Sequence, residues 1–389
     1  MENKTVDFLE SVYILNNLPD FYRELSCTYT PHFDYKNVDN DSFSHIKNNI
    51  VVVKDIPSYL NVKEQSLPKN VKQVKIPYYS GYAINFEGVE STQGYLKSRF
   101  GNSSRYKLRR SVKRLENAFN ISYKMYYGEI SQKEYDTILE VFFKLLEIRS
   151  VEKGIIKNRN VKRKDFYYAN MKSLILNKRA SLFVIYNGDT PIDICLNLHV
   201  DNVVCQLIRT YDINYSKYNT GYIDLIKQID WCLANNIHLL TFMYGAFYWK
   251  KRWCNHTYPY RYDIFYNKKS IKSISKSLIQ ITNHKLRHYL RERGYIDRFH
   301  NIKNSIKEKL HPKESLVVTT ENIDYDKELE LKELVDIYSD KYSFLRRYAF
   351  DFLFNYNEKE KDISLYSMKN NSNKYLIKGI KSKAILNIQ

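Results

Sequence analysis

The sequence has few of the residues that interrupt or cross-link a chain. Its 389 residues include only 11 Gly and 8 Pro, so no Gly- or Pro-rich linker marks a domain boundary. The five cysteines are odd in number and form no C-x-x-C pair, which argues against a disulfide framework and against a zinc site. We therefore expect buried, reduced thiols.

Long apolar runs are also missing. No run approaches the ~18 residues that a membrane-spanning helix needs. The first residues, Met1 to Asp7, carry acidic side chains where a signal peptide needs basic ones. We expect a soluble, cytoplasmic protein. The histidines His199, His238 and His256 lie far apart, no G-x-S-x-G or P-loop pattern occurs, and we expect neither a metal nor hydrolase or kinase chemistry.

Positive charge, by contrast, is in excess. Lys and Arg number 62 against 43 Asp and Glu, for a formal net charge of +19. Such a surplus can attract the phosphates of RNA, CoA, nucleotide sugars or lipid headgroups. The same surplus also follows from a composition rich in Lys, Asn, Ile and Tyr, with 36 Tyr. The charge permits an anionic ligand without identifying one.

The middle of the chain has the clearest secondary-structure pattern. Ser131 to Glu134 has the form of a capping box and begins an amphipathic helix. Asn187-Gly188 is a hairpin turn between two apolar strands. The predicted order is helix, helix, three-strand meander, helix, strand, loop and strand, over residues 131–149, 165–178, 181–186, 192–200, 203–211, 221–233, 237–243 and 260–266.

The flanking parts are less regular. Strand-like runs at Ile50–Val53 and Val71–Phe86 precede a cationic helix over residues 105–116. After residue 270 the pattern favours helices, including one or two over 327–354, with 362–368 and 374–388 as weak strand or tail candidates. We predict an N-terminal α/β domain over 1–118, a central domain over 119–270, and a mainly helical C-terminal extension over 271–389.

Three features could bind a ligand. Gly221 stands where the third predicted helix begins, and free backbone N–H groups at a helix start can hold a pyrophosphate. An ordinary helix start capped by Asn219 or Thr220 explains the same residues. The aromatic and cationic residues of 243–253 suit an anionic or sugar-like ligand, or a loop anchored to the core. The cationic helix could bind phosphates, or be a solvated face.

In this order the elements resemble the GNAT acyltransferase fold, a mixed central sheet flanked by helices in an α/β (α+β) protein. More narrowly they resemble the branch of CelD-type acetyltransferases and Fem peptidyltransferases. The residues that carry the resemblance are Arg105-Tyr106-Lys107-Leu108-Arg109-Arg110, Tyr215-Ser216 followed by Gly221, and Trp249-Lys250-Lys251-Arg252-Trp253. The resemblance covers roughly residues 79–266, and the N-terminal part could be a degenerate GNAT-like half.

The resemblance implies direct acyl transfer from acetyl-CoA or another acyl-CoA to an amine or hydroxyl, without a metal. The acceptor would be a small molecule, such as an amino sugar or nucleotide-linked sugar of bacterial surface-polysaccharide metabolism. The implied acyl-CoA-binding residues are Ile208, Arg209, Thr210, Lys217, Asn219, Thr220, Gly221 and Tyr222. The implied catalytic residues are Tyr244 and Tyr248, and the implied acceptor-binding residues are Arg105, Trp249, Lys250 and Arg252.

Three points stay open in the sequence. No general base stands out, with His199, Asp193 and a water chain as candidates. A Fem-like transfer from aminoacyl-tRNA would use the same fold and suits the positive charge. A non-catalytic module that recognises RNA or a protein is a third interpretation, motivated by a phosphate signature reduced to Gly221.

Overall fold

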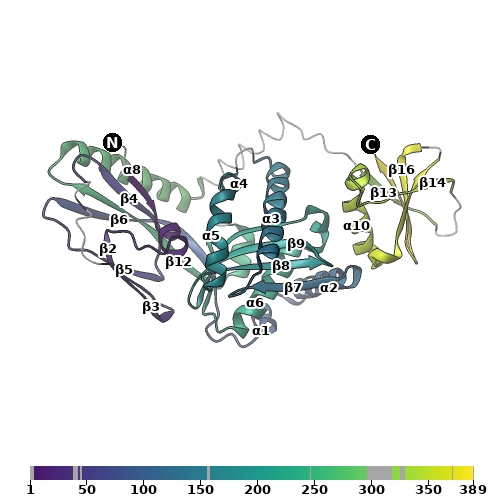
Figure 1. Cartoon of the computed structure of the whole chain (residues 1–389), viewed down its shortest axis with the longest axis horizontal. Helices are drawn as coiled ribbons and strands as arrows, with labels where there is room; N and C mark the ends of the chain where they lie inside the picture. The colour runs from purple at the N-terminus through teal and green to yellow at the C-terminus, as the bar shows by residue number, and fades with distance from the viewer. Residues whose placement is uncertain are drawn as a thin grey trace.

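The computed structural model describes residues 4–37, 43, 46–155, 158–245, 247–295, 318–324, 329–369 and 371–388. Figure 1 shows an N-terminal part built mainly of strands, a central part of strands covered by helices, and a smaller C-terminal part rich in strands. Strands of the N-terminal and central parts belong to one continuous sheet.

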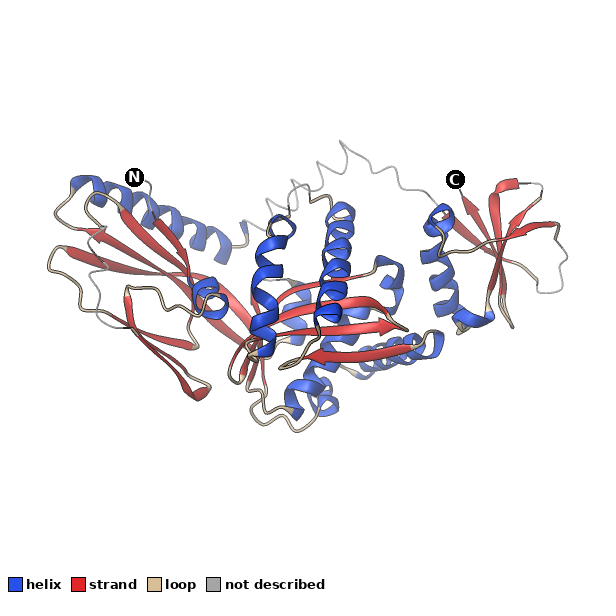
Figure 2. Ribbon diagram, in the orientation of Figure 1, coloured by secondary structure: helices blue, strands red, loops and turns tan. Residues whose placement is uncertain are grey.

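The shared sheet contains nine of the described strands and runs through the N-terminal and central parts (Figure 2). Their order is β1 (Lys4–Asp7), β4 (Ile50–Pro57), β12 (His256–Asn267), β6 (Val71–Asn85), β11 (Leu239–Tyr244), β10 (Val203–Tyr211), β9 (Thr190–Val200), β8 (Ala180–Asn187) and β7 (Ile121–Tyr126). Neighbours are antiparallel except for β1 with β4 and β10 with β11. The long strand β6 pairs with β12 and, near its C-terminal end, with β11, so it joins the two parts.

Helices cover both faces of the central strands. One face carries α3 (Gln132–Glu152), α5 (Lys164–Leu176) and the short π-helix η1 (Glu10–Ile14), and the other carries α1 (Thr92–Arg99), α2 (Asn102–Ala118) and α6 (Thr220–Ala234). Strand β9 shows the division, because Ile194 and Leu196 join the core under α3, whereas Asn197 bonds to Gln228 of α6. This alternation is the period of two that strands impose on side chains.

Smaller elements complete the N-terminal part. A second sheet has the strand order β3 (Thr30–Lys36), β2 (Tyr22–Cys27) and β5 (Leu60–Glu64) among the described residues. Helix α8 (Ile271–Glu292) packs along β6 and β12. One hydrophobic cluster unites Phe8, Leu25 and Leu60 of the N-terminal part with Phe142 and Leu196 of the central part.

The predicted central elements are confirmed. The capping box at Ser131 and Glu134 is present and starts α3, and the meander occurs as β8, β9 and β10. The helix predicted from Gly221 is α6, and the two later strands are β11 and β12. The fold is therefore the mixed α/β arrangement that the sequence pattern predicted.

The mainly helical C-terminal extension is wrong for the described residues. After α8, these residues form a five-stranded sheet with the order β13 (Val318–Asn322), β17 (Lys383–Ile388), β16 (Asn371–Lys378), β15 (Ser364–Met368) and β14 (Leu331–Leu334). Only α10 (Arg346–Tyr356), preceded by the 3₁₀ turn η3 (Asp340–Leu345), is helical within the range predicted as helix, whose start lies partly outside the described residues. In β16 and β17 the buried residues form short consecutive runs, Tyr375 to Ile377 and Ala384 to Leu386, a length typical of strands rather than helices.

Two further properties bear on function. Across the described ranges, no helix is both long and apolar enough to cross a membrane. All five cysteines are buried and none is in a disulfide.

Candidate active site

A gap opens in the middle of the shared sheet, between β10 and β11. The two strands pair in parallel over only three residues each, from Val203 to Cys205 and from Leu239 to Thr241. Beyond these residues the strands diverge, so backbone groups of both strand ends are left for other partners. A ligand that enters the gap can replace the missing strand contacts.

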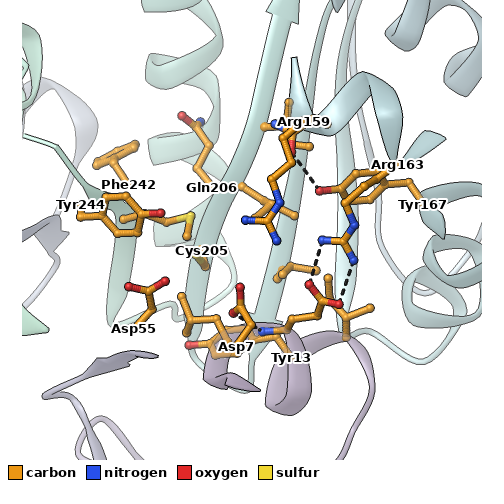
Figure 3. A pocket seen from close by; sticks show the side chains of 18 of the residues that line it. Asp7, Tyr13, Asp55, Arg159, Arg163, Tyr167, Cys205, Gln206, Phe242 and Tyr244 are labelled. Atoms are coloured by element: carbon orange, nitrogen blue, oxygen red, sulfur yellow. Dashed lines mark hydrogen bonds and ion pairs between the residues drawn. The ribbon is translucent and has the colours of Figure 1, made fainter. Parts of the chain in front are cut away.

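A cavity of about 420 Å³ lies at this gap. Its walls come from the two diverging strands and from N-terminal residues, as Figure 3 shows. Asp55 and Tyr244 lie on one side of the view and Arg159 and Arg163 on the other, with Asp7 below. The cavity therefore combines parts of the chain that are far apart in sequence.

Both β4 and β11 bulge where they line the cavity. The pairing of β4 with β12 shifts by one residue, so that Lys54 and Asp55 together lie opposite Tyr262. The pairing of β11 with β6 shifts in the same way at Met243. Asp55 and Met243 have left-handed backbones, with φ 63° and φ 58°. Such strain costs about 1–3 kcal/mol at a non-glycine residue and clusters at functional sites.

Lys250 holds the bulge of β11 in place. Its ammonium donates hydrogen bonds of 2.7 Å to the carbonyl oxygens of Phe242 and of Tyr244, on either side of Met243. The residue is 5% exposed, and burial lowers the pKa of Lys250 to about 8. A lysine with this pKa is still largely charged at pH 7 and gives up a proton more readily than an exposed lysine.

Asp55 is the cavity carboxylate that forms no ion pair with any described residue. It is 6% exposed, and its Oδ1 has no hydrogen-bond partner among the described residues. The other two cavity carboxylates are paired: Asp7 lies 3.3 Å from the ammonium of Lys54, and Glu10 binds both terminal nitrogens of Arg163 at 2.8 Å. Burial raises the pKa of Asp55 to about 6, and the charge of Asp7 acts in the same direction.

Two further groups at the cavity, the Cys205 thiol and the Tyr244 hydroxyl, stay protonated at neutral pH. Burial raises the pKa of the Cys205 thiol to about 12, which makes it a poor nucleophile. Burial also raises the pKa of Tyr244, with the charges of Asp55 and Asp7 as further causes. The Tyr244 ring stacks on Tyr79 with centroids 4.6 Å apart. Tyr244 can therefore donate a hydrogen bond into the cavity but is a weak acid there.

The space beside Gly221 is filled by Arg209. A Cβ at residue 221 would lie 3.1 Å from the guanidinium carbon of Arg209, whose Nη1 donates to the Gly221 carbonyl oxygen at 2.6 Å. The same nitrogen lies 3.5 Å from the buried carboxylate of Asp224. The small size of Gly221 thus serves a protein contact, and a pyrophosphate at this helix start stays a prediction that must accommodate Arg209.

A second, smaller pocket lies against the first turn of α6. It has a volume of about 180 Å³ and contains Asn219 and Tyr222 of the predicted acyl-CoA set, together with Arg252. Lys107 of the cationic helix α2 also lines it. Two cations beside a helix start form a suitable place for an anion.

The predicted site residues fall into three groups: those that line the larger cavity, those that line the smaller pocket, and those that line neither. Ile208, Tyr244 and Lys250 line the larger cavity, and Asn219, Tyr222 and Arg252 line the smaller one. The residues that line neither are Arg105, Arg209, Thr210, Lys217, Thr220, Gly221, Tyr248 and Trp249.

Several residues of this last group have clear surroundings. Tyr248 is 75% exposed, Thr210 and Thr220 are buried, and the Lys217 ammonium lies 4.0 Å from Asp351 of the C-terminal part. Trp249 packs edge-on against Phe242. Their proposed roles stay predictions.

The two candidate bases weighed from the sequence lie elsewhere. Asp193 and His199 are buried on the face of β9 that packs against α6, and neither lines the larger cavity. Asp55, Glu10, Arg159 and other N-terminal and α4 (Arg159–Lys162) residues of the cavity were missed, because only long-range pairing brings them to the gap. A non-glycine bulge carries no sequence signal that could have identified Asp55.

One histidine pair, His284 and His288, has the four-residue spacing of a helical metal site, which the sequence analysis did not consider. In the structure, His288 bonds to the Tyr78 carbonyl oxygen at 2.9 Å, and His284 packs against the rings of Tyr78 and Tyr262. Within the described ranges, no group of three His, Cys, Asp or Glu side chains could hold a metal ion.

Comparisons with known proteins place the central part in a family. Residues 102–251 match the family described as an acetyltransferase (GNAT) domain. This segment begins with α2 and ends in α7 (Tyr248–Trp253), so it includes the gap and Lys250. No curated protein matches the sequence.

Solved structures show only distant likeness. A C-terminal domain of a putative lysylphosphatidylglycerol synthetase from Agrobacterium fabrum is 6% identical, with TM-score 0.38 over 60% of this chain and 72% of that one. FemX is 11% identical, with TM-score 0.36 over 55% and 71%. A tandem GNAT protein from the clavulanic acid biosynthesis pathway is 6% identical, with TM-score 0.29 over 56% and 64%.

The sequence match and the element order agree on the same segment. The helix, meander, helix and diverging strand predicted between residues 131 and 243 lie inside the matched range. Residues 102–251 therefore match a GNAT acetyltransferase domain, and the match covers less than half of the chain.

Proposed function

We propose that the chain transfers an acyl group from acyl-CoA to an amine or hydroxyl acceptor in the cavity between β10 and β11. The observation that carries this proposal is the gap itself, where the strands part after Cys205 and Thr241 and the Lys250 ammonium closes one side. A thioester bound there would lie between backbone groups of a splayed pair and a buried cation. Both can stabilise negative charge on the reacting oxygen.

The donor would run from the smaller pocket to the larger one. The pantetheine arm would follow β10 near Ile208, Arg209 and Thr210, and its diphosphate would lie near Asn219 and Tyr222. Lys107 and Arg252 support this placement because they supply positive charge at the first turn of α6. Arg209, which lies over Gly221, would contact the passing chain.

The chain's residues suit direct transfer. The acceptor nitrogen or oxygen attacks the thioester carbon, and the carbon–sulfur bond breaks with its electron pair leaving on sulfur. Lys250, with a pKa of about 8, is matched to protonate a thiolate, whose usual pKa is near 8.5. Tyr244 supports the same group by a hydrogen bond rather than as an acid. Cys205, held as a thiol, would not form an acyl-enzyme.

A Fem-like transfer from aminoacyl-tRNA is the second candidate. The filling of the space beside Gly221 by Arg209 favours it, because a tRNA ester needs no diphosphate cradle at that point. The formal charge of +19 and the cationic helix α2 also suit a polynucleotide. The gap and Lys250 would act on an ester carbonyl as on a thioester.

A non-catalytic module has less support. Asp55 and Lys250 are buried, and removing water from their charged groups costs free energy. A purely structural cavity would not need to contain such groups. The acceptor class suggested by the sequence, an amino sugar or nucleotide-linked sugar, is compatible with a cavity that contains charges of both signs.

Calorimetric titration of acetyl-CoA tests the donor. We expect binding by the wild-type protein that weakens at least about tenfold in Lys107→Glu, because the substitution reverses a charge beside the proposed diphosphate. Lys133→Glu, on the exposed face of α3, is the matched control and should bind as the wild type does. Absence of heat from folded wild-type protein would contradict the acyl-CoA donor, and filter binding of aminoacyl-tRNA would then be measured.

A further inference from the structure

We propose that the outer face of helix α8 docks on a membrane surface that carries negatively charged lipids, with the helix axis parallel to that surface. The helix lies outside the segment that matches the GNAT family, and none of its residues lines either of the two cavities described above. In Figure 1 it runs along the N-terminal part, where it packs on β6 and β12. The docking surface is therefore one that the proposed transfer does not use.

The face of α8 that packs on the sheet includes polar side chains. The hydroxyl of Ser273, a fully buried residue, donates a 2.8 Å hydrogen bond to the Asn49 carbonyl oxygen. Further along the helix, Nδ1 of His288 donates to the Tyr78 carbonyl oxygen at 2.9 Å. Ile281 adds an apolar contact. A surface helix normally turns its apolar stripe to the core, so serine and histidine at this contact leave most of the large apolar side chains of α8 for another face.

The apolar stripe of α8 faces solvent instead. Ile271 is 86% exposed, and four further apolar side chains of the helix are more than half exposed: Leu278, Ile279, Leu286 and Tyr289. Positions 271, 278 and 289 form one line along the helix, because separations of 7 and 11 residues are close to whole numbers of turns, and positions 279 and 286 lie beside that line. Single exposed apolar residues are common, but a row of five marks a surface for a partner.

Positive charge borders this stripe. Residues 268–293 contain eight Lys and Arg and a single acidic residue. Lys272 and Lys285 are exposed, and the helical period puts them on opposite flanks of the stripe. Lys268 and Lys269 are exposed just before the helix begins. An apolar face bordered by lysines is typical of helices that lie in the headgroup region of a bilayer, where the long lysine side chains reach the lipid phosphates.

An anionic bilayer suits this surface better than RNA or a second copy of the chain. The phosphates of RNA would bind the lysines, but they offer nothing to the row of apolar side chains. A second copy in a two-fold interface would bring the same patch of eight cations against itself, which is repulsive. A bilayer with anionic lipids supplies both negative charge and an apolar layer beneath it.

Co-sedimentation of the full chain with lipid vesicles tests the docking surface. We expect binding to vesicles of phosphatidylserine and phosphatidylcholine in equal parts that weakens in about 0.5 M NaCl, and binding at least about tenfold weaker to phosphatidylcholine alone. Leu278→Glu/Leu286→Glu should weaken binding at least about tenfold, because two apolar side chains no longer enter the bilayer. Both positions are exposed, so this double variant should fold as the wild type does.

Val151→Glu/Leu176→Glu is the matched control for this double variant. It makes the same change of charge at exposed apolar positions of α3 and α5, so it should bind vesicles as the wild type does. Quenching of tryptophan fluorescence by brominated lipids locates the contact. The Leu278→Trp variant should be quenched more than the wild type, whereas Val151→Trp should not.

Absence of vesicle binding by the folded wild-type chain would overturn the proposal, and so would equal binding by Leu278→Glu/Leu286→Glu. Equal affinity for vesicles with and without phosphatidylserine would contradict the role of the lysines. If the wild type ignores vesicles but binds a tRNA mixture by filter retention, the partner of α8 is RNA. If it ignores vesicles but forms a dimer in light scattering that Leu278→Glu/Leu286→Glu dissociates, the partner is a second copy.

Discussion

A chain of buried polar side chains links β9 to the start of α6. His199 bonds to Ser181 at 2.8 Å, and Asn197 bonds to both Ser181 and Gln228. Gln228 donates to Asp224, which lies beside Arg209. The sequence has the pattern Asp-x-Cys-x-Asn-x-His from Asp193 to His199. Alternate residues of a strand point to the same face, so the sequence could predict that these side chains share one face. Their burial was not predictable, because polar side chains at every second position usually indicate a solvent face.

The buried imidazole of His199, at one end of this row of hydrogen-bonded side chains, predicts a fold that loses stability in acid. Burial lowers the pKa of His199 to about 3, below the usual value near 6.5, so the unfolded state binds more protons between these limits. Stability is complete above pH 6.5 and falls as the pH falls towards 3. Between pH 7 and pH 4 we expect the wild type to lose about 3 kcal/mol more than His199→Gln, measured by urea unfolding at each pH. Equal losses would contradict a neutral buried imidazole.

The site residues that the sequence identified lie close together along the chain, whereas those that it missed lie far from them. Tyr244 and Lys250 were found because the first ends β11 and the second follows it within a local motif. Asp55 lies almost two hundred residues earlier and reaches the cavity only because β4 pairs with β12, which pairs with β6 next to β11. Strand pairing over such separations is set by the whole fold, and no local residue pattern encodes it.

Elements with local signals were predictable. Ser131 and Glu134 bond reciprocally at the start of α3, with a Glu134 oxygen 2.6 Å from the Ser131 hydroxyl, as the four-residue pattern indicated. The strands of the C-terminal part were predicted poorly, because their buried residues, such as Leu365 and Leu376, are few and lie among Asn and Lys. Such a strand gains its stability from neighbours that a single segment does not reveal.

Helix α10 attaches the C-terminal part to the central one. Phe350 packs against Phe119 with ring centroids 4.8 Å apart, and the Tyr218 hydroxyl donates to the Phe350 carbonyl oxygen at 3.1 Å. Tyr215, one of the residues that carry the resemblance to the GNAT fold, packs in the same cluster. Contacts with α10 therefore hold the segment that precedes α6 in place.

Removing one ring of this contact should loosen the attachment. We expect Phe119→Ala to destabilise the chain by about 3 kcal/mol, because it leaves a cavity among buried aromatic rings. Differential scanning calorimetry should show a lower or divided transition. Tyr106→Ala, at an exposed aromatic of helix α2, which ends just before Phe119, should change stability by no more than about 0.5 kcal/mol. An equal effect of both substitutions would mean that the aromatic cluster does not couple the two parts.

At the scale of the whole molecule, the segment that matches the family is not a closed unit. Residues 102–251 end before β12 and begin after β6, yet β11 pairs with β6 along its length. One hydrophobic cluster also crosses this limit, from Phe8 and Leu60 to Phe142 and Leu196. The N-terminal part thus supplies a sheet neighbour, a share of the core and one wall of the cavity.

This continuity predicts that the matched segment does not fold alone, although its length is within the range of independent domains. Without β6, the edge of β11 would expose unpaired backbone groups and buried side chains such as Leu239 and Leu240. We expect a fragment of residues 102–251 to show no cooperative thermal transition by circular dichroism and to aggregate on size-exclusion chromatography. A fragment of residues 1–295 contains all nine strands and should unfold cooperatively, at a lower temperature than the full chain because it lacks α10. A cooperative transition from 102–251 would show that the GNAT segment folds before, and without, the strands that complete its site.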